Sequence, residues 1–544
     1  MASLQPSPAA PPAAAFPSRR GWLWWVAAAV GVYAALLAAH WPLLHLPYYW
    51  DEAGYFVPAA LDLFRHGWWI PRTTLANGHP PLLMAALALA WRVGGVGIAV
   101  SRCTVLIFAA ALVLGTARLA GMLAGRRAAW IAGLWLAVMP LCFAQATLVQ
   151  LDLPAAAWAV WALVAWASGR RWIYAALAAA ACLTKETAIL IPLVLGVGAL
   201  AQWLRRRDRI WPALGPHVLA ALPLIAWFAC YHAATGYWMG NAGFLAYNLH
   251  TALSLPRIGM ALALRIWQLA GYDGMAAITV AALLALWLRR HPGLGQAHGV
   301  PGPAGAASGL GPAPVDAGRA AQPRWGPRPS IELWAIVAAY VVFHAWIGGA
   351  VLDRYVLPAI ALYIVLLAPA VAGVRHAGLR RAIVTAVAAW LVAGWLWNPP
   401  YPFPFEDNLA YATFVRLQQR AIRALLARAP VLPVLTAWPA TNELTDPSLG
   451  YLRRPIAVAP VESFSASALR GRRLAPGQYA LLYMRVYQPP HSWLRRWPQW
   501  LHWKERYFGY RPPESVQGLL RQIRGRPVWR AAAHGQWAML AKGG

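Results

Sequence analysis

Apolar runs of about 17 to 20 residues recur along most of the chain, and each is long enough to cross a bilayer as a helix. Short segments rich in Arg, Pro and Gly separate them. This pattern predicts an α-helical polytopic membrane protein with about 11–13 transmembrane helices. We place the apolar segments at residues 22–39, 80–98, 103–121, 128–147, 153–168, 172–183, 187–203, 213–231, 272–288, 332–350, 356–373 and 381–397.

The pattern changes after Trp397, where no run of membrane length remains. Short apolar stretches and a helical pattern from Tyr411 to Ala427 predict a small C-terminal α/β domain over residues 398–544. Residues 1–20 are expected to form a cytoplasmic tail, and residues 21–397 the transmembrane domain. Pro, Gly and Ala dominate residues 291–330, which predicts a disordered cytoplasmic loop within that domain.

Composition agrees with a membrane location. Hydrophobic residues make up 60% of the chain and charged residues only 12%, against about 25% charged in soluble proteins. The net charge of +30 does not indicate nucleic-acid binding, because the basic residues lie between apolar segments and in the tail and form no compact basic domain. The four cysteines lie in apolar segments without metal-ligand spacing and are interpreted as small buried residues.

The orientation follows from pairs and triplets of arginines, which prefer the cytoplasmic side. Placing them inside puts residues 40–79, the short loops near 150, 185 and 353, residues 232–271 and the C-terminal domain outside. This arrangement requires an odd number of crossings between residues 79 and 126, where two apolar segments lie. We therefore expect segment 80–98 to be re-entrant or interfacial, which leaves about 11 crossings.

Two adjacent acids, Asp51 and Glu52, follow the first apolar segment and precede an expected interfacial helix. Aromatic residues surround them in the sequence YYWDEAGYF. A partly desolvated carboxylate at this depth is suited to act as a general base or to bind a cation. Capping of the interfacial helix by Asp51 is the alternative reading.

His79 and Asp152 lie at the borders of other apolar segments. His79 precedes Pro80 and Pro81, which fit the first turn of a helix, so the imidazole is left at the helix mouth, where it can hydrogen-bond a phosphate or a sugar. Asp152 is the only acid between Asp62 and Glu186. It either caps the helix that follows or belongs to a polar site.

Two cations complete the set of candidates. Lys185, one of three lysines in the chain, lies between apolar segments, where ionisable groups are expensive and usually functional. It either pairs with Glu186 or binds a lipid phosphate. Arg354, followed by Tyr355, offers bidentate contact to a phosphate, unless it only pairs with Asp353 to tie a loop.

The predicted topology brings these residues to the outer face of the membrane. Carboxylates able to deprotonate a hydroxyl would then lie beside cations able to hold a leaving phosphate. Glycosyl transfer from a lipid-phosphate sugar needs this combination, and nucleotide sugars are absent outside the cell. The paired acids also permit a divalent cation, although nothing in the sequence requires one.

These motifs resemble, as an ordered set, the GT-C glycosyltransferases, close to the bacterial protein O-mannosyltransferases and the aminoarabinose (lipid A) transferases. The resemblance covers residues 20–400. It rests on Asp51-Glu52 after the first helix, His79-Pro80-Pro81-Leu82, which looks like the HPPL of the mannosyltransferases, Leu151-Asp152, Thr184-Lys185-Glu186 and Arg354-Tyr355-x-x-Pro358. His79 stands where the lipid A branch has lysine.

The resemblance implies an inverting sugar transfer from a polyprenyl-phosphate donor to a lipid A, protein or glycan acceptor at the periplasmic face of the inner membrane. The implied base is Asp51, with Glu52 supporting it and Asp152 positioning acceptor or sugar. His79, Lys185, Arg354 and Tyr355 would hold the donor phosphate. Two other hypotheses stay open: a transporter or flippase of lipid-linked sugars, and a polymerase or ligase of surface polysaccharide.

Overall fold

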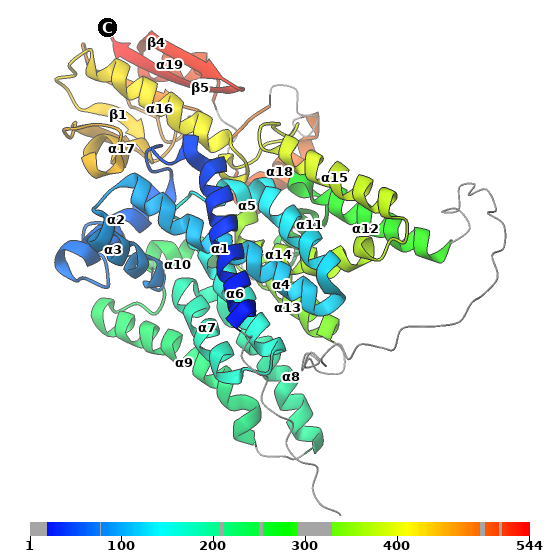
Figure 1. Cartoon of the computed structure of the whole chain (residues 1–544). Coiled ribbons are helices and arrows are strands. Elements are labelled where there is room, and N and C mark those ends of the chain that lie inside the picture. Colours follow the sequence, from blue (N-terminus) through cyan, green and yellow to red (C-terminus); the bar gives the residue numbers. More distant parts are fainter. Residues whose placement is uncertain are drawn as a thin grey trace, which may run out of the picture.

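A computed structural model describes residues 19–76, 78–206, 210–249, 254–291, 329–489, 496–510 and 514–544. The predicted N-terminal tail and the predicted disordered loop lie almost wholly outside these residues. The described chain forms a large helical region and a smaller region that carries a sheet (Figure 1). The predicted fold class, a helical membrane protein with a small C-terminal α/β domain, is confirmed.

Most of the predicted apolar segments are helices. Seven helices within the described residues are long and apolar enough to cross a membrane, and α3, α6, α7 and α13 are shorter apolar helices. The helical region consists of α1 (Arg19–His40), α2 (Val57–His66), α3 (Leu82–Gly94), α4 (Ile98–Val138), α5 (Pro140–Gln145), α6 (Asp152–Ala167), α7 (Arg171–Thr184), α8 (Leu190–Arg206), α9 (Ile210–Thr235), α10 (Ala242–Leu249), α11 (Leu255–Ala270), α12 (Met275–Arg290), α13 (Pro329–Trp346), α14 (Leu357–Ala372) and α15 (Ala377–Gly394).

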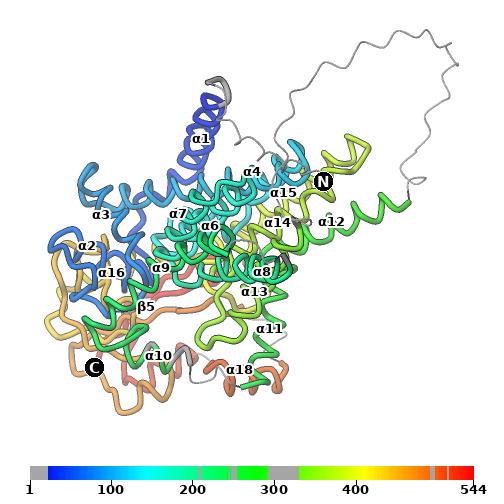
Figure 2. Tube along the Cα trace, turned by 90° about the horizontal axis from the view of Figure 1, so that it is seen from below, coloured from blue at the N-terminus to red at the C-terminus, as the bar shows by residue number. Residues whose placement is uncertain are grey.

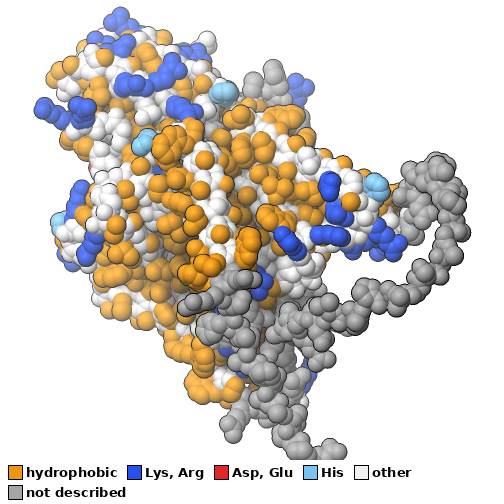
Figure 3. Space-filling view, viewed as in Figure 1, with side chains coloured by type: hydrophobic (Ala, Val, Ile, Leu, Met, Phe, Trp, Pro, Cys, Tyr) orange, Lys and Arg blue, Asp and Glu red, His pale blue; other side chains and the backbone are white. Residues whose placement is uncertain are grey.

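Hydrophobic side chains cover the helical region in a broad band, whereas Lys and Arg gather over the sheet-bearing region and at the helix ends (Figure 3). This distribution is that of a protein whose middle faces lipid tails, which offer no hydrogen bonds to polar groups. Many large apolar side chains are exposed on the helices, among them Leu89, Ile107, Trp130, Val197 and Val280. The chain is therefore a polytopic membrane protein.

The two predicted segments at 103–121 and 128–147 form a hairpin within α4. Non-helical backbone at Ala124 and Gly125, with φ of +80° at Gly125, turns the chain back. A Cβ added at Gly133 would lie 3.1 Å from the Cβ of Ala117, a contact that a straight helix cannot make. The turn places Arg126 and Arg127 next to the bend between the two arms of the hairpin, and the membrane side that they face stays a prediction.

Helix α3, which replaces the predicted segment 80–98, has only 13 residues. At 1.5 Å per residue it is about 20 Å long, shorter than the hydrocarbon core of about 30 Å. It packs on α2 and α4. Its length favours the prediction that this segment does not span, while the count of 11 crossings stays a prediction.

The predicted external loop 232–271 contains two helices that the hydropathy pattern did not indicate, α10 and α11. Helix α11 carries Arg257, Arg265 and Gln268, which interrupt the apolar pattern. These three side chains are buried because α11 packs against α13 and turns its polar face inward. Part of the expected loop therefore consists of helices, one of which packs on the helical region.

The C-terminal region is an α/β unit with a five-stranded sheet in the order β2-β1-β3-β5-β4. Strands β2, β1 and β3 are parallel, and β3, β5 and β4 are antiparallel. The elements are α16 (Ala410–Leu426), β1 (Val434–Ala437), α17 (Ala440–Thr445), β2 (Val458–Val461), β3 (Tyr479–Tyr483), α18 (Pro498–Phe508), α19 (Val516–Ile523), β4 (Gly525–Ala533) and β5 (Gln536–Gly543). The predicted helix at Tyr411 to Ala427 is α16.

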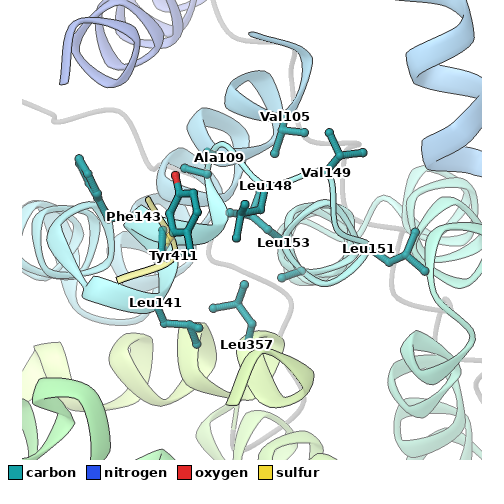
Figure 4. Packing of buried hydrophobic residues seen from close by; sticks show 14 of the residues in the cluster. Val105, Ala109, Leu141, Phe143, Leu148, Val149, Leu151, Leu153, Leu357 and Tyr411 are labelled. Carbon is teal, nitrogen blue, oxygen red and sulfur yellow. The ribbon is translucent and has the colours of Figure 1, made fainter. Parts of the chain in front are cut away.

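This unit is packed onto the helices through a shared core. Tyr411 of α16 lies among Ala109, Leu141, Phe143 and Leu357, which come from α4, α5 and α14 (Figure 4). Helix α18 lies beside α11, as contacts and the tube view both show (Figure 2). The sheet-bearing region therefore covers one end of the helical region.

Backbone bonds fix the same unit to the first loop. The amide of Tyr48 donates to the carbonyl of Leu449 at 3.1 Å, and the hydroxyl of Tyr451 donates to the carbonyl of Tyr48 at 3.1 Å. Beneath this joint lies Glu443 of α17, which is fully buried. Burial raises the pKa of Glu443 from its ordinary value near 4.5 to about 8.

The raised pKa predicts a pH-dependent stability of this joint. The unfolded chain ionises Glu443 above about pH 4.5 while the folded chain keeps it protonated up to about pH 8, so the free energy of unfolding falls across that interval. We expect Glu443→Gln to lose this dependence. Thermal unfolding of the detergent-solubilised protein can be followed between pH 5 and 8.5. The Tm of the variant, relative to that of the wild type, should rise as the pH rises.

The exposed Glu462 provides the matched control, since Glu462→Gln should follow the wild type at every pH. A difference in Tm between wild type and Glu443→Gln that does not change with pH would contradict the prediction.

Candidate active site

The first loop leaves α1 and turns into the one-turn π-helix η2 (Glu52–Phe56), at whose N-terminal end Asp51 lies. Asp51 caps no helix with its side chain, so the capping alternative is excluded. Its carboxylate instead pairs with the Nη2 atom of Arg354. The Asp51 side chain keeps 20% of its surface exposed.

Arg354 lies in the single turn η6 (Asp353–Val356) that precedes α14. Its guanidinium is buried and faces acidic side chains from three other segments. Besides pairing with Asp51, its Nη1 lies 3.5 Å from Oδ2 of Asp152 and its Nε lies 2.9 Å from Oε1 of Glu406. Nη1 also donates to Oε1 of Gln150 at 2.7 Å. Arg354 therefore joins segments that lie hundreds of residues apart in sequence.

Lys185 lies between α7 and the 3-10 turn η3 (Glu186–Ile189). Its Nζ pairs with Oδ1 of Asp152, which excludes the simple alternative of a Lys185–Glu186 pair. Glu186 accepts from Nδ1 of His79 at 2.9 Å. Asp152, at the start of α6, makes no capping bond with its side chain and contacts both Lys185 and Arg354.

Tyr355 is the centre of the cationic side of the site. Nζ of Lys185 lies 4.1 Å from the centroid of its ring, and the guanidinium carbons of Arg354 and Arg265 lie at 5.4 Å and 5.9 Å. Like charges this close repel, and the negative face of the aromatic ring offsets part of the repulsion. The carboxylates of Asp51, Asp152 and Glu406, which pair with Lys185 and Arg354, offset more of it.

Glu52 lies apart from this network although it is the neighbour of Asp51. Its carboxylate is fully buried and forms a salt bridge with Arg102 of α4. It also accepts from the amides of Tyr49 at 2.7 Å and Val149 at 2.5 Å. Arg102 in turn donates to the carbonyl of Leu46 at 3.1 Å and to those of Pro47 and Thr147.

The structure thus brings five of the predicted residues into one network: Asp51, Asp152, Lys185, Arg354 and Tyr355. His79 is joined to Glu186, the residue after Lys185. Glu52 is adjacent in sequence but turned into the protein, where no substrate can reach its carboxylate. The alternative of an Asp353–Arg354 pair is excluded, since both carboxyl oxygens of Asp353 lack a hydrogen-bond partner among the described residues.

The sequence analysis missed three members of the network, Gln150, Arg265 and Glu406, and it also missed Arg102, the partner of Glu52. Glu406 lies in the turn η7 (Phe405–Asp407), near the start of the predicted C-terminal domain. Burial raises the pKa of Glu406, Arg354 opposes this shift, and Asp51 adds to it.

Arg265 was missed because it lies in the stretch interpreted as an external loop. Its Nη1 donates to Oε1 of Gln268 at 2.8 Å and to the carbonyl of Leu352 at 2.6 Å. Arginines at 257 and 265 within an otherwise apolar stretch were the available signal. Among the residues that the structure describes, no group of three or more His, Cys, Asp and Glu side chains is placed to hold a metal ion.

Comparison with known proteins finds similarity in structure alone. No model of a known protein family matches the sequence, and no curated protein matches it. The chain is similar to ArnT from Cupriavidus metallidurans bound to undecaprenyl phosphate, with a TM-score of 0.51 and 16% identity over 96% of this chain and 98% of that one. The apo state of the same protein gives a TM-score of 0.50 and 15% identity over 95% and 98% of the two chains.

A third solved structure, the archaeal oligosaccharyltransferase AglB from Archaeoglobus fulgidus with an inhibitory peptide and a dolichol-phosphate, has a TM-score of 0.41 and 12% identity over 85% of this chain and 70% of that one. The match to ArnT extends over nearly the whole of both chains, including the C-terminal region. The chain therefore has the same overall fold as ArnT.

Proposed function

We propose that this protein is an inverting glycosyltransferase that moves a sugar from a polyprenyl-phosphate donor to a hydroxyl-bearing acceptor at the periplasmic face of the inner membrane. The observation that carries the proposal is the single network in which the exposed carboxylate of Asp51 meets the cations grouped around Tyr355. ArnT, whose fold this chain shares, was solved with undecaprenyl phosphate bound.

Asp51 is the general base in this proposal. Among the carboxylates around Arg354 its side chain is the most exposed, at 20% against 3% for Asp152 and Glu406, so an acceptor hydroxyl can approach it. The hydroxyl gives its proton to Asp51 as its oxygen attacks the anomeric carbon. Attack from the side opposite the phosphate inverts the configuration at that carbon.

Lys185, Arg265 and Arg354 hold the phosphate of the donor and stabilise the charge that develops on it as the bond between the anomeric carbon and the phosphate oxygen breaks. Tyr355 keeps the three cations together before the donor arrives. His79, joined to Glu186 beside Lys185, lies where it can add a hydrogen bond to the phosphate. The polyprenyl phosphate then leaves with both electrons of the broken bond.

Asp152 and Glu52 act through other residues. Asp152 contacts Lys185 and Arg354 together and so fixes their spacing. Glu52 and Arg102 tie the first loop to α4 and to residues 147–149, which sets the position of Asp51. We therefore assign Glu52 a positioning role.

Replacing the proposed base tests the function directly. Asp51→Asn keeps the size of the side chain but cannot accept the proton, so transfer should fall by about 10²–10⁴-fold. Native membrane vesicles containing the protein would receive undecaprenyl-phosphate mannose or undecaprenyl-phosphate aminoarabinose, each with a labelled sugar, and label in acceptors would be counted. The exposed Glu505 of α18 supplies the control Glu505→Gln. Undiminished transfer by Asp51→Asn would exclude Asp51 as the base.

The positioning role of Glu52 predicts a rescue. Glu52→Met leaves Arg102 buried without its ion partner and should cost about 3–5 kcal/mol of stability. The double variant Glu52→Met with Arg102→Met removes both charges and should recover most of that loss, together with part of the transfer activity. Thermal unfolding in detergent and the vesicle assay measure the two quantities. A double variant that recovers neither stability nor transfer would contradict the positioning role.

The orientation can be tested without any substrate. A reporter enzyme that is active only in the periplasm, fused after Gly544, should be active because the C-terminal region covers the site. A second fusion after Arg127, at the turn of α4, should be inactive. Activity of a cytoplasmic reporter at Gly544 would reverse the proposed orientation.

A further inference from the structure

Aromatic residues flank Asp51 in the first loop. Trp50 precedes it and Tyr55 follows it, and both are half-buried. Trp50 has a φ of +50°, a left-handed backbone that bulky residues seldom adopt and that costs about 1–3 kcal/mol. This conformation sets the indole of Trp50 against Tyr49 and Phe414, with ring centroids 5.8 Å and 6.2 Å away.

A third ring comes from the C-terminal region. Trp438, directly after β1, lies edge-on to Trp50 with centroids 4.6 Å apart and lies 6.2 Å from Tyr55. Its approach depends on Gly54, because a Cβ there would lie 2.9 Å from the indole Nε1 of Trp438. Trp438 is itself half-buried. We call Trp50, Tyr55 and Trp438 the aromatic wall.

A cation stands at the edge of the wall. The guanidinium carbon of Arg485, just after β3, lies 5.6 Å from the ring centroid of Trp50. Its Nη1 makes one long bond, 3.4 Å, to the carbonyl of Glu462, and its Nε is buried without a hydrogen-bond partner among the described residues. The donors of Arg485 are thus little used by the protein itself.

We propose that the aromatic wall binds a pyranose ring of the acceptor, so that the acceptor is a saccharide, either free or attached to a lipid. The proposal rests on the proposed function and names the acceptor class for that site. The faces of a pyranose carry C–H groups, which pack on aromatic faces, while its hydroxyls point outward from the ring edge. Trp and Tyr rings match both features, because their faces are apolar and their edges carry a polar N–H or O–H group.

The position of the aromatic wall beside Asp51 would bring a bound sugar to the proposed base. A sugar stacked on Trp438 and Trp50 would direct hydroxyls of its rim toward Asp51, which lies next to Trp50, and others toward Arg485. A peptide acceptor would have no equivalent use for two neighbouring indoles beside the base. Burial raises the pKa of Tyr55, and the charge of Asp51 adds to that shift.

Binding can be measured without transfer. Saturation-transfer NMR on the protein in nanodiscs would use methyl pyranosides of glucose, mannose, galactose and N-acetylglucosamine, and a Gly-Ser-Thr-Gly peptide as the non-saccharide probe. We expect at least one pyranoside to receive saturation at its ring protons and the peptide to receive none. Trp438→Ala should weaken that binding about tenfold, as loss of a central aromatic contact does.

Matched variants separate the wall from the rest of the molecule. Trp438→Phe should retain most of the binding, and Trp69→Ala, which removes an exposed indole from the loop after α2, should leave it unchanged. The binding assay needs neither a donor nor a base, so a failure of the proposed base leaves its result intact. Pyranosides presented on a lipid in the nanodisc, compared with soluble ones, show whether the saccharide comes from a glycolipid.

Three results would overturn the inference: no pyranoside binds in either form, Trp438→Ala binds as well as the wild type, or the peptide alone binds and does so through Trp438. A wild type that binds a pyranoside at the wall but transfers no sugar would instead overturn the proposed function.

Discussion

The structure depends on one buried guanidinium. Arg354 lies in apolar surroundings, where an unpaired charge is too costly to keep, so acidic side chains have to be brought to it. They come from the first loop, from the start of α6 and from the turn before α16. The need to pair this charge therefore specifies how four distant segments meet, and the meeting point is also where Asp51, the proposed base, and the cations lie.

The two acids of the first loop show how neighbours in sequence acquire different tasks. Asp51 turns toward the opening and Glu52 turns inward to Arg102, because a single helical turn points successive side chains in different directions. The Glu52–Arg102 pair holds the backbone of the first loop in place, and the carboxylate of Asp51 is left partly accessible. Rigid support beneath one reactive group is what precise positioning requires.

Many of the helices and several residues of the candidate site could be predicted from the sequence. Apolar runs predicted the helices because lipid imposes a length and a composition on each span, and scarce charges at their ends predicted Asp51, Asp152, Lys185 and Arg354. Glu406 and Trp438 were not predictable, since nothing local shows that the C-terminal region folds back over the first loop. Arg265 was not recognised as a site residue because its helix has a buried polar face and therefore low hydropathy. The ion-pair partners of Lys185 and Glu186 were not predictable either, because they come from segments that are distant in the sequence.

The docking of the C-terminal region also sets an order of assembly. The chain is made from its N-terminal end, so the first loop is synthesised long before Glu406, Trp438 and Leu449 exist. Until those residues arrive, Arg354 lacks one of its acids and Trp50 lacks a neighbouring ring. The network around Arg354 is therefore completed only after the C-terminal region has been made and has docked, and a chain cut before that region would carry Asp51, Lys185 and Arg354 without the segments that pair and cover them.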